Sequence, residues 1–176
     1  MRTTIIAVVG SKKSGKTTAI EALTRALTRR GYKVAAVKHV SEENFSIDTE
    51  GKDTWRFARA GAKTIIAISS NEIATIEKRK TESISLRQIL QKCRGNDVVL
   101  IEGLRRFVAR DKRILKIVTV KSAEEALGAA NDLEPILAFV GPFSTKNLNL
   151  KAPYVDTFKD PEALADIVED VIKKES

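Results

Sequence analysis

A glycine-bordered loop near the start of the chain limits its fold more than any other feature. The segment Gly10-Ser11-Lys12-Lys13-Ser14-Gly15-Lys16-Thr17 fits the phosphate-binding pattern G-x-x-x-x-G-K-[ST] at every fixed position. The consecutive apolar residues of Thr3–Val9 before it are typical of a strand buried on both faces. The stretch from Lys16 to Arg30 after it repeats apolar residues at helical spacing. A strand, a glycine-rich turn and a helix in this order predict a loop that binds phosphate.

Each fixed position of this loop has a chemical reason. Gly10 and Gly15 let the backbone curl around an anion in conformations that side chains would obstruct. Successive backbone N–H groups then point inward, and the N-terminus of the following helix adds the positive end of its dipole. The Lys16 ammonium is placed to reach the β- and γ-phosphates of a nucleotide, and the Thr17 hydroxyl is a suitable ligand for Mg²⁺.

A carboxylate follows a second buried run. Val98–Ile101 is apolar throughout and leads directly into Glu102, as in a Walker B segment. The carboxyl ends of parallel strands share one edge of an α/β sheet, which is where such sheets bind ligands. We therefore expect Glu102 to hold the water shell of Mg²⁺ or to orient an attacking water, the alternative being a solvated acid at a strand end. Lys16 and Glu102 are the catalytic candidates, and Thr17 and Glu102 are the metal candidates.

Two further positions are candidates on the same reasoning. Lys38 and His39 end a predicted strand and precede a long polar loop, which belongs at the ligand-binding edge. We expect His39, the single histidine, either to contact a phosphate or a second ligand, or to be an ordinary residue at a strand end. Gly51-Lys52-Asp53 opens a short helix whose N–H groups would suit another anion. A plain helix cap accounts for Asp53 equally well.

The remaining apolar runs predict an α/β fold. A strand over Tyr32–Lys38, joined to the first strand by the helix, makes a β-α-β unit and so a parallel sheet. Ser70-Asn71 predicts the turn of an antiparallel hairpin. Capping signals at Ser85, Ser122 and Asp160 predict three helix starts. We expect a single P-loop nucleotide-binding domain over residues 1–176, with a three-layer αβα architecture and a mainly parallel sheet that carries an antiparallel hairpin. Its other predicted strands cover residues 63–69, 97–101, 115–120 and 136–140.

Composition narrows the function classes. The 176 residues include one cysteine, Cys93, which excludes an internal disulfide, and no Cys/His cluster indicates structural zinc. No segment approaches the roughly 20 apolar residues of a membrane span, so we expect a soluble, cytoplasmic protein. The net charge of +8 favours anionic ligands. Aromatic residues make up only 5% of the chain and no basic tract is interleaved with them, which argues against nucleic acid as the main partner.

At these motifs the sequence resembles the MobB family, the molybdopterin-guanine dinucleotide biosynthesis adaptor proteins. The resemblance extends over nearly the whole chain, and the order Lys-His, Gly-Lys-Asp, Ala-Gly-Ala is more specific than the phosphate loop alone. The similar segments are Gly10–Thr18, Val37-Lys38-His39, Asp48 with Gly51-Lys52-Asp53-Thr54, Ala60-Gly61-Ala62, Val99-Leu100-Ile101-Glu102-Gly103, Asn147-Leu148-Asn149-Leu150 and the closing helix.

The resemblance implies a homodimeric GTP-binding P-loop protein with weak GTPase activity at most. Its role would be to assist the MobA-like guanylyltransferase that joins GMP to molybdopterin, with GTP and Mg²⁺ as cofactors and with molybdopterin itself as a further possible ligand. The residues it implies for nucleotide binding are Gly10, Ser11, Lys12, Lys13, Ser14, Gly15, Lys16, Thr17, Thr18, Lys38, His39 and Asp53, with Thr17 and Glu102 serving Mg²⁺.

The chain departs from the family pattern in two places. Lys38-His39 continues as Val40-Ser41-Glu42 where relatives often carry more histidines, and Glu50 stands where proline often precedes Gly-Lys-Asp. No Asn-Lys-x-Asp motif for reading guanine is present in the sequence. Guanine specificity is therefore implied by the resemblance alone.

Three other functions stay open from the sequence. A P-loop kinase or ligase-like enzyme would use ATP on a small anion held by Lys38, His39 and Lys52. A GTP-switched metallochaperone is the second, although one Cys and one His make a poor metal-carrying set. Salt-sensitive binding to nucleic acid is a minor third.

Overall fold

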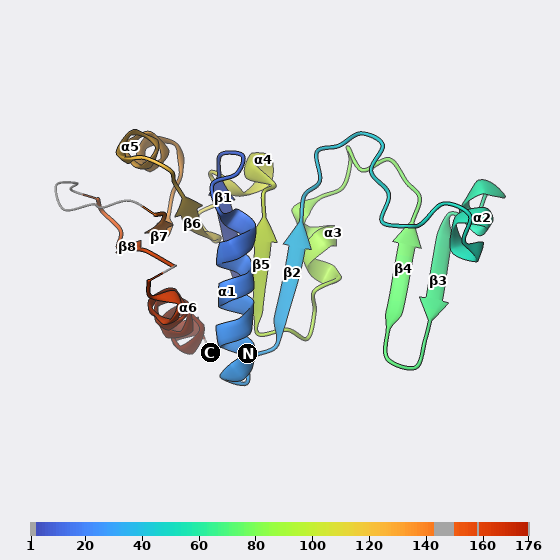
Figure 1. Ribbon diagram of the computed structural model, residues 1–176, viewed down its shortest axis with the longest axis horizontal. Helices are drawn as coiled ribbons and strands as arrows, with labels where there is room; N and C mark the ends of the chain where they lie inside the picture. Colours follow the sequence, from blue (N-terminus) through green and yellow to red (C-terminus); the bar gives the residue numbers. More distant parts are fainter. Residues whose placement is uncertain (1–2, 143–149, 158, 176) are drawn as a thin grey trace. The chain divides into compact units, whose positions relative to one another are not determined.

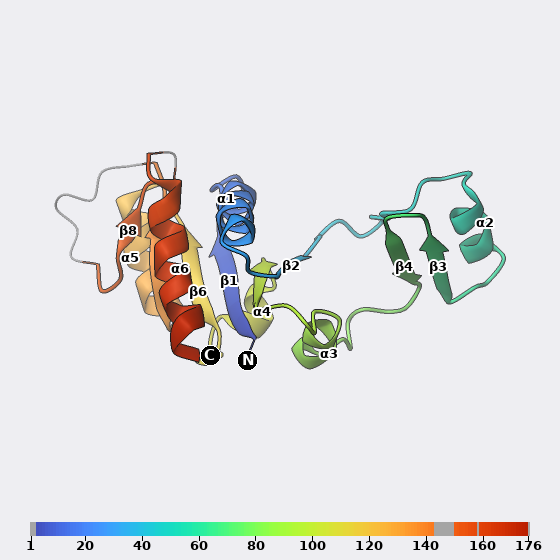
Figure 2. The same cartoon turned by 90° about the horizontal axis from the view of Figure 1, so that it is seen from below.

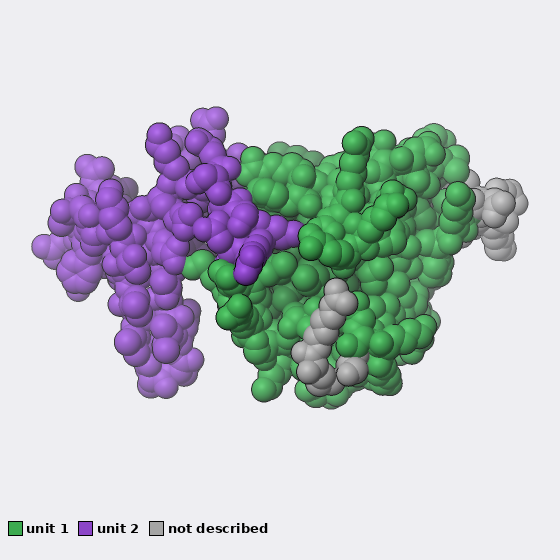
Figure 3. Space-filling model, turned by 180° about the vertical axis from the view of Figure 1, so that it is seen from behind, with its two compact units in different colours: residues 1–39, 89–176 green, residues 40–88 purple. Residues whose placement is uncertain are grey.

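The computed structural model describes residues 3–142, 150–157 and 159–175. Asn147 to Asn149, part of one similar segment noted above, lie outside the described residues. Contacts divide the chain into two compact units, unit 1 with residues 1–39 and 89–176, and unit 2 with residues 40–88 (Figure 3). The interpretation of residues 1–176 as one nucleotide-binding domain stays a prediction.

Unit 1 is built on a six-stranded sheet in the order β2-β5-β1-β6-β7-β8 (Figure 1). Every neighbouring pair in this sheet is parallel, which confirms the predicted parallel α/β architecture. Its strands are β1 (Thr4–Gly10), β2 (Val34–Lys38), β5 (Val98–Glu102), β6 (Leu115–Thr119), β7 (Ile136–Val140) and β8 (Tyr154–Val155).

The register of the sheet places strand ends together. β5 lies between β1 and β2, although it follows both in the sequence. Glu102, the last residue of β5, is the register partner of Val8 on one side and of Lys38 on the other. The predicted edge of functional residues therefore exists in the fold.

Helices cover both faces of the sheet in unit 1. Helix α1 contacts α6, and both pack on a buried cluster that includes Ile6, Leu100 and Ile117 from alternate positions of the strands (Figure 2). Val118, one residue after Ile117, therefore faces the opposite side of the sheet, and α5 lies on that side. The helices of the chain are α1 (Lys16–Arg29), α2 (Asp53–Arg59), α3 (Leu86–Gln91), α4 (Arg105–Val108), α5 (Ala123–Asp132) and α6 (Pro161–Glu175).

The second predicted strand is less buried than expected. The sequence predicts a buried strand over Tyr32–Lys38, yet none of the residues of β2 (Val34–Lys38) is fully buried. The reason is its place at the end of the sheet order, where it has one neighbouring strand instead of two. The apolar pattern alone did not distinguish this edge strand from the central ones.

Unit 2 contains the predicted antiparallel hairpin. β3 (Thr64–Ile68) pairs with β4 (Ile73–Glu77), and Ile68 lies opposite Ile73 beside the turn. The Ser85 cap is confirmed, because the Gln88 N–H donates to Ser85 Oγ at 3.3 Å and the Ser85 N–H donates to Gln88 Oε1 at 2.9 Å. Among the described residues, no helix is both long and apolar enough to cross a bilayer.

Candidate phosphate-binding site

The loop between β1 and α1 is held against the neighbouring strand β6. A Cβ added to Gly10 would lie 2.2 Å from Thr119 Oγ1 and 2.3 Å from the Thr119 carbonyl oxygen, so only glycine fits there. At the other end, Gly15 has φ +90°, in the left-handed region that favours glycine, and α1 begins at the next residue. The two glycines of the motif thus have separate structural reasons.

Thr119 is a residue of the site that the sequence did not reveal. It is 1% exposed, and its hydroxyl lies 2.6 Å from Ser14 Oγ and donates to the Val9 carbonyl at 3.2 Å. Ser14 in turn donates to the Ser11 carbonyl at 2.8 Å. These bonds fix the curl of the loop from inside. Ser14 is 8% exposed, so its side chain supports the loop.

Lys16 lies folded over the loop. Its ammonium donates to the carbonyl oxygens of Ser11 at 2.6 Å and Gly10 at 3.2 Å. Burial lowers the pKa of Lys16, and the nearby charges of Lys38 and Lys121 lower it further, whereas Glu102 opposes them. An anion in the loop would offer this ammonium stronger acceptors than the two carbonyls, because bonds between ionised partners are the stronger ones.

Glu102 joins the loop to the edge strand. Its Oε2 accepts from the Thr17 hydroxyl at 3.1 Å, and its Oε1 lies 2.6 Å from the Lys38 ammonium. The Glu102 side chain is only 12% exposed, whereas that of Lys38 is 56% exposed. A hydroxyl and a carboxylate this close at the start of α1 are the hard oxygen donors that Mg²⁺ prefers, so the donor set fits that ion.

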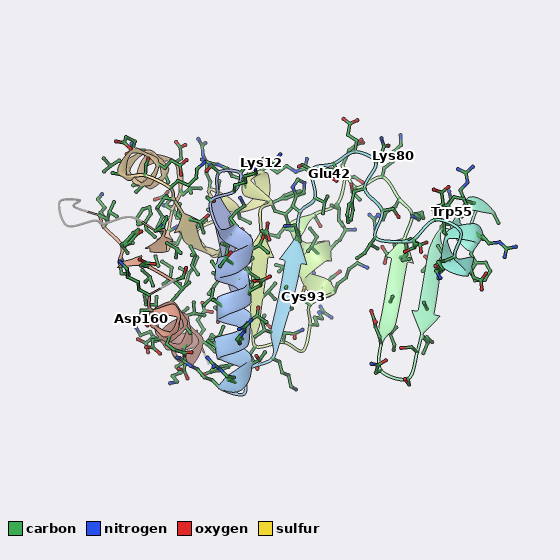
Figure 4. The ribbon with its side chains drawn as sticks, viewed as in Figure 1. Lys12, Glu42, Trp55, Lys80, Cys93 and Asp160 are labelled. Atoms are coloured by element: carbon green, nitrogen blue, oxygen red, sulfur yellow. The ribbon has the colours of Figure 1, made fainter. Side chains whose placement is uncertain are left out.

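The exposed side of the loop carries its remaining cations. Figure 4 shows Lys12 at the end of the sheet toward which the strands run. Lys12, Lys13 and Thr18 are exposed, so they are open to a ligand. Ser11 donates to Glu125 Oε1 at 3.1 Å, which ties the loop to the first turn of α5. The Lys121 N–H donates to the same carboxylate, and this bond is the main cause that lowers the pKa of Glu125.

The other candidate residues differ in position. His39 is exposed and continues β2, with its N–H donating to the Glu102 carbonyl at 3.0 Å. Its Cβ would lie 3.2 Å from a Cβ added to Gly103, so it packs beside the end of β5. Asp53 belongs to unit 2, where it starts α2 and lies 3.4 Å from Arg56 Nη1. Its place in the nucleotide site stays a prediction.

Helix α2 also carries Trp55, which is labelled in Figure 4, and the Arg59 guanidinium lies 5.7 Å from the centre of the Trp55 ring.

Over the part of the chain that the structure describes, no three His, Cys, Asp or Glu side chains are grouped so as to hold a metal ion. A magnesium ion at Thr17 and Glu102 would therefore need the oxygens of a bound phosphate or water as further ligands.

One residue of the site, Glu125, had a sequence signal that was not used for this purpose. It stands three residues after Ser122, which is the spacing of a capping box, and that cap is present, since the Glu125 N–H donates to Ser122 Oγ. Its helix follows β6, whose carboxyl end lies at the same edge as the loop. Lys38 and Glu102 were both candidates because they end predicted strands. Only the pairing of β2 with β5 brings them together.

Known proteins of one family are similar to this chain. A family profile described as MobB, "Molybdopterin guanine dinucleotide synthesis protein B", matches residues 5–141. A "Molybdopterin-guanine dinucleotide biosynthesis adapter protein" of Haemophilus influenzae is 34% identical over 103 residues, which cover 57% of this chain and 57% of that protein. The Escherichia coli protein of the same description is 27% identical over 178 residues, covering 98% of this chain and 95% of its own.

Solved structures share the fold. A crystal structure of "molybdopterin-guanine biosynthesis protein B (mobB)" superposes with a TM-score of 0.72 at 24% identity, covering 96% of this chain and 99% of that one. Bacillus subtilis MobB gives a TM-score of 0.71 at 23% identity, covering 93% of this chain and 97% of its own. At these identities the structural likeness concerns the fold.

Proposed function

This chain belongs to the MobB family, and from that premise we propose that it is a GTP-binding adapter in the synthesis of molybdopterin guanine dinucleotide. The observation that carries the nucleotide part is the 3.1 Å bond between Thr17 and Glu102 at the mouth of a complete phosphate loop. The distribution of charge supports it. Residues 40–88 hold eight basic and eight acidic side chains, so the net charge of +8 belongs to unit 1, which contains the loop.

The residues of the loop would divide the work of binding. The Lys16 ammonium exchanges its two carbonyl partners for β- and γ-phosphate oxygens, while backbone N–H groups surround the β-phosphate. Thr17 and Glu102 hold Mg²⁺, which neutralises phosphate charge when bound. Lys12 and Lys13 add positive charge at the open side. The preference for guanine over adenine rests on the family.

Slow turnover fits the partners of Glu102. Its two carboxylate oxygens are already bonded to Lys38 and Thr17. These two partners compete with an attacking water for the carboxylate. We propose GTP hydrolysis at most slow, with Glu102 orienting water and Lys16 stabilising charge on the phosphates.

The adapter role concerns a partner protein. The relatives are described as adapter proteins of molybdopterin-guanine dinucleotide biosynthesis. We propose that this chain likewise assists a MobA-like guanylyltransferase, with molybdopterin as a further ligand. The aligned region spans only 57% of the Haemophilus relative. We therefore infer the adapter role from membership of the family and not from that one relative.

Calorimetric titration with nucleotide tests the proposal. GTP with Mg²⁺ is expected to bind more tightly than ATP with Mg²⁺, and Lys16→Ala is expected to abolish binding of both without loss of fold. Lys33→Ala is the matched control, because Lys33 is an exposed lysine before β2, outside the site. Tighter binding of ATP would contradict the guanine assignment. Binding that survives Lys16→Ala would contradict the whole site.

We also propose that the protein is a homodimer. On one face of the hairpin in unit 2, Ile66, Ile68 and Ile73 are 59%, 75% and 70% exposed. Adjacent exposed isoleucines on a two-stranded sheet are unfavourable in water, and a second copy of the same surface would cover them. Light scattering after size exclusion is expected to give twice the 19.4 kDa mass. Ile68→Lys should then give monomers, and a monomeric wild type would contradict the proposal.

A further inference from the structure

A cavity borders the phosphate loop on the opposite side of the sheet from α1. It measures about 250 Å³ and has an apolar base formed by Val118, Val120 and Leu133. α5 forms one wall, and Ser11 of the phosphate loop, bonded to Glu125, forms the border with the nucleotide site. Ile117 packs under α1 and α6, so Val118 at the base of the cavity faces the other side of the sheet. Gly10, Ser11 and Thr119 also line the cavity, which therefore adjoins the phosphate loop.

Gly128 in the wall of this cavity has no packing explanation. It lies inside α5, where glycine destabilises a helix relative to alanine. A Cβ added to Gly128 would meet no heavy atom within 4 Å, so no neighbour requires its absence. The bare backbone leaves the wall flat at this point. Glycine at such a place allows another group to approach the backbone closely.

The rim of the cavity carries opposite charges. Arg105 Nη2 lies 3.1 Å from Asp132 Oδ2, and the two side chains are 55% and 66% exposed. An exposed ion pair of this kind adds little stability, so a ligand can open it at small cost. Once opened, the guanidinium would donate to a carbonyl or ring nitrogen, and the adjacent carboxylate would accept from two N–H groups.

We propose that this cavity binds a 2-amino-4-oxopyrimidine ring, the ring that guanine and pterins share. Its flat face would lie on the apolar base and along the wall at Gly128. The Asp132 carboxylate would accept from the ring N–H and the amino group, and Arg105 would donate to the carbonyl oxygen. The choice of this ring rests on the proposed function, since both halves of molybdopterin guanine dinucleotide contain the ring. The cavity and its charged groups are observed independently of that function.

The test uses probes without phosphate, so that it does not depend on the phosphate loop. The full chain is titrated with 6-hydroxymethylpterin, followed by its fluorescence, and with guanosine, followed by calorimetry. Gly128→Leu is expected to fill the cavity and abolish binding, and it should fold because the added side chain enters open space. Ala130→Leu places the same side chain on an exposed position of the same helix, outside the cavity lining, and should bind normally.

A second variant tests the recognition chemistry. Asp132→Asn replaces one of the two acceptor oxygens by a donating NH2 group and removes the charge, so it is expected to weaken binding about tenfold or more, while thermal stability is unchanged. Pterin binding that follows this pattern identifies a pterin as the source of the ring, and guanosine binding that follows it identifies guanine. Absence of binding by both probes up to about 1 mM, or binding that survives Gly128→Leu, overturns the proposal. Lys16→Ala should leave probe binding intact, which separates this result from failure of the nucleotide site.

Discussion

The Lys38 ammonium lies 2.6 Å from Glu102 Oε1, across the parallel pair β2–β5 in which the two residues are register partners. Glu102 is largely buried, so its negative charge needs a nearby cation. Lys38 supplies that cation in the structure, at the carboxylate that we assign to Mg²⁺. The ion and the ammonium would therefore share one carboxylate, and the charge of Lys38 becomes important whenever Mg²⁺ is absent.

Replacement of Lys38 by methionine should distinguish the contribution of Lys38 to GTP binding from that of Mg²⁺. Without Mg²⁺, the lone Glu102 carboxylate would repel the phosphates, and we expect GTP affinity in EDTA to fall about tenfold. With saturating Mg²⁺ the loss should be much smaller, because the ion replaces the missing positive charge. Lys38→Arg keeps the charge and serves as the control in the same calorimetric titration. An equal loss with and without Mg²⁺ would show that Lys38 acts elsewhere.

Gly10→Ala should damage the loop through sterics alone. The new Cβ would lie 2.3 Å from the Thr119 carbonyl oxygen, a backbone atom that cannot rotate away. We expect a loss of about 1–3 kcal/mol in the free energy of unfolding, the usual range for overpacking a well-packed interior, together with loss of GTP binding. Urea unfolding measures the first effect. Gly128→Ala, where the Cβ meets open space, should be neutral or stabilising, and an equal loss there would contradict the steric explanation.

Local patterns predicted the parts of the fold that depend on adjacent residues. The apolar run, the glycine positions and the apolar stripe of α1 are all within the first 30 residues, and each is present. The Ser85 and Ser122 caps join residues three positions apart, and both were found. Such features are readable because the interacting groups lie close together along the chain.

Long-range pairing was not readable. The contact of Gly10 with Thr119 joins residues more than 100 positions apart, and no local pattern indicates it. The insertion of β5 between β1 and β2 likewise depends on the whole sheet, so neither the exposure of β2 nor the Lys38–Glu102 pair followed from the sequence. Leu104 is buried at φ +52°, a conformation that a leucine adopts at a cost, and nothing in its neighbourhood predicts it.

Asp111 should contribute to stability above pH 4 and lose that contribution in acid. The Arg113 guanidinium and N–H donate to its carboxylate and lower its pKa to about 2. The folded state therefore binds the proton more weakly than the unfolded state, and stability falls as pH drops from about 4 to about 2. Because Arg113 is 79% exposed, solvent screens the pair and we expect about 1 kcal/mol.

Urea unfolding of wild type and Asp111→Asn at several pH values checks this sign. The variant should be less stable at pH 5, and the difference should shrink toward pH 2. A difference that stays constant over this range would assign the effect to packing or to hydrogen bonds that do not depend on charge.

Arg30 should be the main ionic tie between α1 and α6. Its guanidinium lies 2.7 Å from carboxylate oxygens of Glu162, Asp166 and Glu169, and its side chain is only 22% exposed. Removal of the guanidinium would leave three carboxylates facing one another, so Arg30→Ala should cost about 2 kcal/mol in the free energy of unfolding.

The neighbouring Arg29 provides the matched control for this prediction. Its side chain is 64% exposed and pairs with Glu162, so Arg29→Ala should cost less than about 0.5 kcal/mol. Arg30→Lys should recover only part of the loss, because an ammonium cannot reproduce the planar fork of a guanidinium. In urea unfolding at low and at 1 M salt, the loss in Arg30→Ala should be larger at low salt, where the repulsion among the carboxylates is unscreened. A loss for Arg30→Ala as small as that for Arg29→Ala would contradict the prediction, and the α1–α6 contact would then be held by its apolar residues.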